Sequence, residues 1–370
     1  MKRVLFLIML GLFLVSCGTR KPIDVTPVPT LRPYKLTPIN AGNVDQIQAL
    51  YTIHVTDELH PEYLLEISPD KKWVALTPKD SAPLNIQRLK WESDDSFVPM
   101  GNGFSTFFLY RTTSLAFSPD AMHIAVANRA NNSVLVFDLL DLPDEAKQIS
   151  LSIGDRPEAL TFTKDNQKLI VGTQGGGYGV LQLWDFATAS FKQEIAGDTL
   201  GNVCSAAISP DGKILAAGSC ATFDISTWDV DHGYTPLSQS SGADQIDSAQ
   251  RNLFAFNPAT GELASGADFP RITIYDARTG KISATVTMHP VADSLSASDS
   301  VSTLAYTSDG AMLVLDANQQ IQLFDAKSGK LLWRHEDPKR IAAVAISADS
   351  KLMVSISAGG DLVFWGVPVK

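Results

Sequence analysis

A short turn motif recurs seven times between Tyr63 and Trp365, and this repetition restricts the chain to very few folds. Each copy has a Ser-Pro-Asp turn or a variant of it, and successive copies lie 40 to 50 residues apart. The seven copies are Ser68-Pro69-Asp70, Ser118-Pro119-Asp120, Thr163-Lys164-Asp165, Ser209-Pro210-Asp211, Asn257-Pro258-Ala259, Ser308-Asp309-Gly310 and Ser347-Ala348-Asp349. A period of this length, built from short strands, is typical of a β-propeller with one blade per copy.

The residues before each turn predict the innermost strand of each blade. In every copy, apolar residues stand three and five positions before the Asp of the turn, or before Ala259 in the fifth copy, which is the period-two alternation of a strand. Six copies place a small residue between them, as expected where neighbouring blades crowd together: Ala116, Thr161, Ala207, Ala255, Ala305 and Ala345. The expected fold is therefore an all-β, seven-bladed propeller spanning residues 44–370.

The ends of the repeat array predict how the ring closes. The last copy has three strands, which leaves its blade without an outer strand. The segment Ile47–Ile53 alternates like a strand and precedes the first copy. We expect this N-terminal strand to join the last blade and remove an exposed sheet edge.

Several repeats resemble known propeller families. Trp184-Asp185 and Trp228-Asp229 match the dipeptide of the WD-repeat family, and the resemblance spans about Val44 to Lys370. The Gly-His pair of that family is missing, so its histidine-centred hydrogen bonds are not implied here. The stretch Ile124–Leu139 resembles a lactonase-like propeller, and Leu323–Trp333 is similar to a quinoprotein blade. The WD-repeat resemblance implies a scaffold for protein contacts.

The N-terminus indicates export and anchoring. A basic pair, Lys2 and Arg3, precedes the apolar stretch Val4–Val15, which is too short to span a membrane and typical of a signal peptide. Leu14–Gly18 resembles the bacterial lipobox, which implies cleavage after residue 16 and lipidation of Cys17. The alternative is an ordinary signal peptide with an incidental cysteine. We expect an extracytoplasmic protein anchored by lipid to a bacterial membrane.

Residues 17–43 are expected to form a disordered, Pro/Thr-rich tether. The first 43 residues contain six of the 30 basic and one of the 40 acidic side chains, so residues 44–370 carry a formal charge of −15. An acidic body argues against a nucleic-acid partner, whereas a basic tether suits an anionic membrane surface.

The two cysteines of the propeller, Cys204 and Cys220, lie on either side of the fourth turn. Pairing of the strands about that turn would bring them together, and an exported compartment permits a disulfide. The alternative is two buried, unbonded thiols, because paired strands do not guarantee the geometry that a disulfide needs.

Arginines recur where the chain enters the innermost strands. Arg111, Arg156 and Arg340 stand nine residues before the Asp of their turns, and Arg251 is adjacent to the equivalent position of the fifth copy. In a propeller such positions form a ring around one mouth of the central channel. The ring either recognises carboxylates or phosphates of a partner, or each arginine pairs with a nearby acidic residue.

No catalytic motif accompanies this ring. The six histidines show no metal-type spacing, and neither a metal nor any other cofactor is expected. The sequence therefore favours a non-catalytic lipoprotein that scaffolds an unidentified protein partner in the cell envelope. The alternative is an exported lactonase-like hydrolase, or a binder of a small anionic ligand at the central channel.

Overall fold

The computed structural model describes residues 33–369 except 82, 100–103, 108, 110, 143–147, 153, 176–178, 197–200, 220–223, 241–252, 269–270, 288–300 and 318–319. These residues belong to one compact unit, Arg32–Lys370. Short strands dominate it, and the one helical element of the described part is the 3-10 turn η1 (Val44–Gln46). No helix in these ranges is both long and apolar enough to cross a membrane.

The recurring turn is held by its own side chains. In the first copy, Ser68 Oγ donates to Asp70 Oδ1 at 2.7 Å and accepts from the backbone nitrogen of Trp73 at 2.9 Å. Asp70 also accepts from the backbone nitrogen of Lys72, which fixes the chain reversal. The sixth copy begins one residue earlier than expected, because Thr307 takes the serine role and bonds Asp309 at 2.7 Å.

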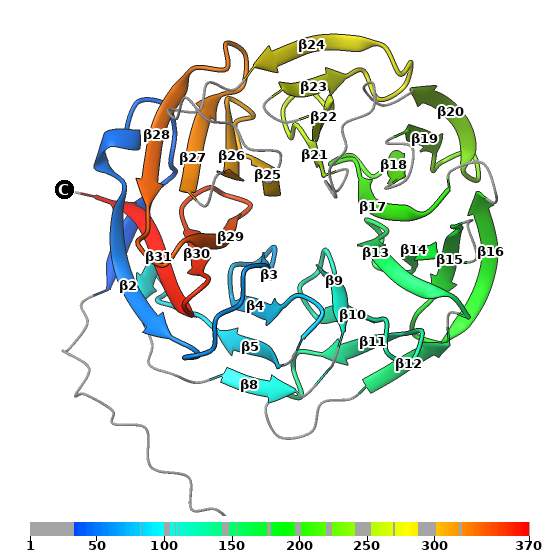
Figure 1. The fold of residues 1–370 in the computed structure, drawn as a ribbon, viewed down its shortest axis with the longest axis horizontal. Helices are drawn as coiled ribbons and strands as arrows, with labels where there is room; N and C mark the ends of the chain where they lie inside the picture. The colour runs from blue at the N-terminus through cyan, green and yellow to red at the C-terminus, as the bar shows by residue number, and fades with distance from the viewer. Residues whose placement is uncertain are drawn as a thin grey trace, which may run out of the picture. The chain divides into compact units, whose positions relative to one another are not determined.

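Six repeats form four-stranded antiparallel sheets, arranged around a central opening in Figure 1 with the first strand of each repeat innermost. The first three are β3 (Tyr63–Ile67), β4 (Trp73–Pro78), β5 (Leu84–Arg88) and β8 (Phe104–Phe107); β9 (Thr112–Phe117), β10 (His123–Asn128), β11 (Ser133–Asp138) and β12 (Gln148–Ser152); and β13 (Arg156–Phe162), β14 (Leu169–Gln174), β15 (Leu181–Asp185) and β16 (Ser190–Ala196).

The next three sheets repeat the same order of strands from the channel outward. They are β17 (Val203–Ile208), β18 (Ile214–Ser219), β19 (Ile225–Asp229) and β20 (Thr235–Ser240); β21 (Phe254–Phe256), β22 (Leu263–Asp268), β23 (Arg271–Tyr275) and β24 (Ile282–Thr287); and β25 (Val301–Tyr306), β26 (Met312–Ala317), β27 (Gln320–Asp325) and β28 (Leu331–Glu336).

The last repeat corrects the expectation of a seven-bladed propeller. Its strands β29 (Ile341–Ile346), β30 (Met353–Ser357) and β31 (Asp361–Pro368) belong to a seven-stranded sheet, so six regular blades stand beside one composite sheet. β2 (Gln48–His54) pairs with β31 between Asp361 and Gly366, which is the pairing predicted for this N-terminal segment. The physical reason for the larger sheet is the length of β31, whose last residues extend beyond β2 and offer a further edge.

A second N-terminal strand, β1, takes that edge and overturns the tether boundary at residue 43. β1 (Tyr34–Thr37) pairs with Val367 and Pro368 of β31 on one side and with β7 (Ser96–Val98) on the other. β7 forms a hairpin with β6 (Lys90–Trp91), inserted between the third and outer strands of the first blade. Because Leu36 is 4% and Ile39 1% exposed, this part of the expected tether is packed structure.

The core is divided among the contacts between neighbouring blades. One cluster joins Val134 and Val136 of the second repeat to Leu160, Phe162 and Trp184 of the third. Its members come from alternating strand positions, so each sheet buries both faces against its neighbours. The innermost strand of each repeat is the one that lies beside the central channel.

Candidate functional site

The three described arginines of the predicted ring occupy equivalent places. Arg111 immediately precedes β9, Arg156 begins β13 and Arg340 immediately precedes β29, and all three side chains are exposed. The carbonyl of Arg111 accepts from the backbone nitrogen of Arg129 at 3.0 Å, and that of Arg340 from Ala358 at 2.7 Å. Because the inner strands are equivalent elements of the ring, these residues mark one mouth of the central channel, here called the arginine mouth.

The guanidinium groups of the arginine mouth are not paired with carboxylates of the described residues. The alternative in which each arginine pairs with an acidic neighbour is therefore not what the described part of the chain adopts. Arg251 lies outside the described residues, so its membership of the ring stays a prediction.

A different arginine links three blades at the same mouth. Arg129, in the loop after β10, donates through Nε to Glu158 of β13 at 2.8 Å and through Nη2 to Gln174 at 3.2 Å. The Nη1 atom of Arg129 lies 3.8 Å from Oδ1 of Asp80 in the first repeat. Glu158 is only 3% exposed, and a carboxylate so buried needs this compensation. Arg129 therefore has a structural partner, whereas the three ring arginines have no acidic partner among the residues that the structure describes.

The channel beneath this mouth contains a cavity of about 280 Å³ lined by inner-strand residues. Three carboxylates lie on its wall, those of Glu62, Glu66 and Glu158, together with the Lys79 ammonium. Lys79 pairs with Glu62, as Arg129 does with Glu158. Sequence reasoning missed Glu66, although a signal was present: it replaces the small residue that the other six copies carry at the same register position.

Glu66 differs from the other two glutamates in its surroundings. Its side chain is open to the channel space, yet no hydrogen bond or ion pair joins it to the described residues. Enclosure by the channel wall removes water from the carboxyl, and this desolvation raises its pKa from 4.5 to about 7. The carboxyl of Glu66 therefore changes charge near neutral pH.

A second cavity, of about 590 Å³, lies beside Arg340 and is lined partly by Leu59, Pro338 and Ala358. His54 stands on its wall at the end of β2, with Nδ1 2.7 Å from Asp361 and Nε2 2.9 Å from Asp57. Hydrogen bonds to Asp361 and then Asp57 raise the pKa of the imidazole above its ordinary 6.5. Leu59 is 80% exposed, so this cavity offers an apolar surface next to a ring arginine.

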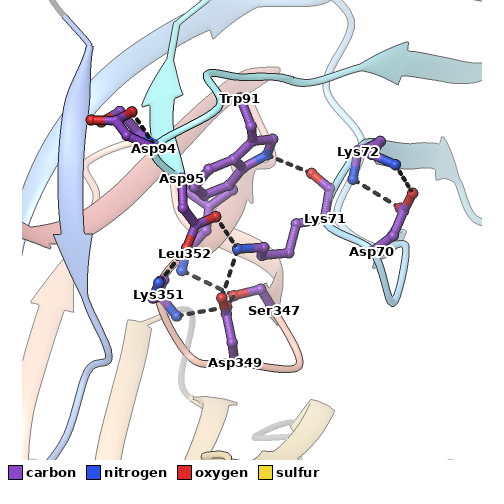
Figure 2. A network of polar contacts seen from close by, with 11 residues as sticks. Asp70, Lys71, Lys72, Trp91, Asp94, Asp95, Ser347, Asp349, Lys351 and Leu352 are labelled. Atoms are coloured by element: carbon purple, nitrogen blue, oxygen red, sulfur yellow. Dashed lines mark hydrogen bonds and ion pairs between the residues drawn. The ribbon is translucent and has the colours of Figure 1, made fainter.

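A polar network joins the first and last repeats (Figure 2). The Lys71 ammonium lies 2.8 Å from Asp95 and 2.7 Å from Asp349, and Lys351 pairs with the other oxygen of Asp95. The Lys71 nitrogen is also 4.3 Å from the centre of the Trp91 ring, whose Nε1 donates to the Lys71 carbonyl at 2.7 Å. Asp95 follows β6 in the inserted hairpin, so this network fastens the two ends of the repeat array to each other.

The cysteines are only partly within the described chain. Cys204, on β17 and on the wall of the channel cavity, is disulfide-bonded. Cys220 and Cys17 lie outside the described residues, so the pairing of Cys204 with Cys220 and the lipidation of Cys17 stay predictions. Among the described residues, no group of three or more histidine, cysteine or acidic side chains is arranged to hold a metal ion.

Two family models match parts of the chain. One, described as outer membrane protein assembly factor BamB, matches residues 226–367. The other, described as WD domain, G-beta repeat, matches residues 190–229. Both matches support the resemblance to WD-repeat and quinoprotein-like propellers, and the first contains the Leu323–Trp333 stretch. No curated protein matches the chain.

Proposed function

We propose that this protein is a lipid-anchored, extracytoplasmic lipoprotein whose propeller binds another protein of the cell envelope and has no catalytic activity of its own. The observation that carries the proposal is the arginine mouth: three exposed guanidinium groups at equivalent positions, unpaired with the described carboxylates. In a body of charge −15 such groups are available for an external partner.

The arginine mouth defines the chemistry of that partner. A guanidinium group forms paired hydrogen bonds with a carboxylate, so a protein surface rich in Asp and Glu is the expected ligand. The exposed Leu59 beside Arg340 adds an apolar contact, and such apolar and arginine contacts are enriched in protein interfaces. The partial match to a family described as an outer membrane protein assembly factor supports an envelope role.

The hydrolase or small-anion alternative has less support. An anionic lactone or sugar acid in the channel would face the unpaired carboxylate of Glu66, while the nearby cations Lys79 and Arg129 are already paired with Glu62 and Glu158, which is unfavourable electrostatically. The anion-binding groups lie outside the cavity, at the arginine mouth, where a macromolecule can reach them.

Partner binding is tested with residues 32–370, because β1 belongs to the propeller. The immobilised protein is exposed to envelope extract beside two variants: Arg111, Arg156 and Arg340→Glu, and a matched control with Arg88, Arg278 and Arg334→Glu. The retained protein is identified by mass spectrometry, and its binding is measured again after purification. Loss from the first variant alone is expected; equal retention by both variants would exclude the arginine mouth, and no retained protein would count against the scaffold.

Anchoring is tested separately with the full chain. Cys17→Ala should move the protein from the membrane to the soluble fraction, because acyl chains supply the attachment. Mass spectrometry of the mature N-terminus should show acylated Cys17 in the wild type. A mature wild-type protein that is soluble and unacylated would contradict the lipoprotein proposal without affecting the binding test.

A further inference from the structure

We propose that the central channel binds a small primary ammonium compound with a short aliphatic body, its charged nitrogen held by the carboxylate of Glu66. The cavity, of about 280 Å³, lies just below the usual size range of sites for drug-like ligands, about 300–1,000 Å³, and so suits a small molecule. This site is distinct from the arginine mouth and does not depend on the partner proposed above.

The first argument is charge balance inside the channel. Glu62 is neutralised by Lys79, and Glu158 by Arg129, whereas Glu66 has no cationic partner among the described residues. The wall around the channel lowers the local dielectric, so an unpaired carboxylate there attracts a cation more strongly than one on the outer surface, although the Glu66 side chain stays accessible to water in the channel. The channel therefore favours a positive ligand, the opposite of the small anion in the alternative hypothesis from the sequence.

The second argument is the chemistry of the other residues on the cavity wall. Leu64, Leu253 and Leu304 contribute aliphatic surface, and Ser205 places a buried hydroxyl there that has no hydrogen-bond partner in the described chain. An alkylammonium ion matches both features, because its nitrogen carries three donors and its carbon chain suits leucine side chains. A divalent metal ion would need several oxygen ligands converging on one point, and no such group is found among the described residues.

The third argument is position. The other six copies carry alanine or threonine where the first has Glu66, and none of these six residues lines the cavity, so Glu66 alone of this register position reaches its wall. A single acidic side chain among six small ones provides one charged contact without filling the space. Its removal should not unfold the ring: Glu66→Ala would restore the residue found in five other copies.

Binding is tested by calorimetry and NMR on residues 32–370, with n-butylamine and 1,4-diaminobutane as probes and sodium butyrate and potassium chloride as counter-probes. At about pH 8 the amines should bind saturably in the millimolar range or tighter, and Glu66→Gln should weaken them about tenfold or more. Glu194→Gln, an exposed glutamate on the outer strand β16, is the matched control and should leave binding unchanged.

Acidification supplies a second measurement that needs no variant. Lowering the pH to about 6 should weaken amine binding several-fold in the wild type, because the Glu66 carboxyl becomes protonated. The other ionisable groups on the wall are Glu62, Tyr63, Lys79 and Glu158, and the pKa of Tyr63, raised to about 12 by burial and by Glu58, keeps it neutral throughout. Absence of saturable amine binding, equal affinity in Glu66→Gln, or preference for butyrate would each overturn the proposal.

Discussion

The Lys71 ammonium of the first repeat lies 2.7 Å from the Asp349 carboxylate of the last repeat, which ties together turns at opposite ends of the array. The Lys71 side chain is 15% exposed and has Asp95 as a second acidic partner. Lys71 thus separates two carboxylates that would otherwise repel each other.

Replacement of Lys71 should loosen this junction. Lys71→Met should lower the free energy of unfolding by about 1–2 kcal/mol, because Asp349 then loses its cation and Asp95 keeps only Lys351. Lys72→Met is the matched control: Lys72 pairs with Asp70, but its side chain is 57% exposed, and the loss should stay below about 0.5 kcal/mol. Urea unfolding measures both, and equal losses would contradict the role assigned to Lys71.

Truncation of the N-terminal segment should destabilise the propeller. Ile39 is 1% exposed and packs in the cluster with Val44 and Met312, so Ile39→Ala should cost about 2–4 kcal/mol. A chain beginning at residue 44 also loses β1 and should unfold at lower urea concentration than one beginning at residue 32. If the two chains unfold together, residues 32–43 contribute nothing to stability.

Stability should depend on the protonation of His54. A group with a raised pKa in the folded protein contributes fully below its unfolded value and loses its contribution as pH rises through the folded value. The pKa of His54 is raised above 6.5 by Asp361 and Asp57, so the contribution should fade from about pH 6.5 upward. Thermal unfolding of the wild type and His54→Ala should therefore differ more at pH 6 than at pH 9; a constant difference would refute this dependence.

The partner of Cys204 can be identified chemically. If Cys204 pairs with Cys220, Cys220→Ser should leave one thiol in denatured residues 32–370 that reacts with a maleimide, whereas the wild type should have none without reductant. Mass spectrometry counts the modified thiols. A reactive thiol in the unreduced wild type would show that Cys220 is not the partner.

Local sequence pattern predicted those parts of the fold that depend on local chemistry. Ser209 and Asp211 were expected in a turn because the hydroxyl and carboxylate complete it by themselves, and they bond at 2.5 Å. The alternation of residues 47–53 likewise predicted a strand, and β2 is that strand. In both cases residues close together in the sequence determine the local structure.

Other parts depend on residues far apart in the chain. Prolines 33 and 38 flank β1 and suggested an extended tether, but the free edges of β31 and β7 decide its structure. The candidate site also has a part that the sequence predicts and a part that it does not. The positions of Arg111, Arg156 and Arg340 follow from the repeat register. The ion pairs that leave Glu66 alone in the channel depend on contacts between different strands and blades.

The shared edge of β31 also determines when the propeller can be completed. β1 and β2 precede all seven repeats in the chain, yet β31, with which both of them pair, belongs to the last repeat. The pairings of β1 and β2 with β31 join residues that are more than 300 positions apart in the sequence. Contacts between residues so far apart slow folding most, because a long loop must close before they form. In the nascent chain β2 therefore stays without its partner strand, and β1 has only β7, until β31 has been synthesised.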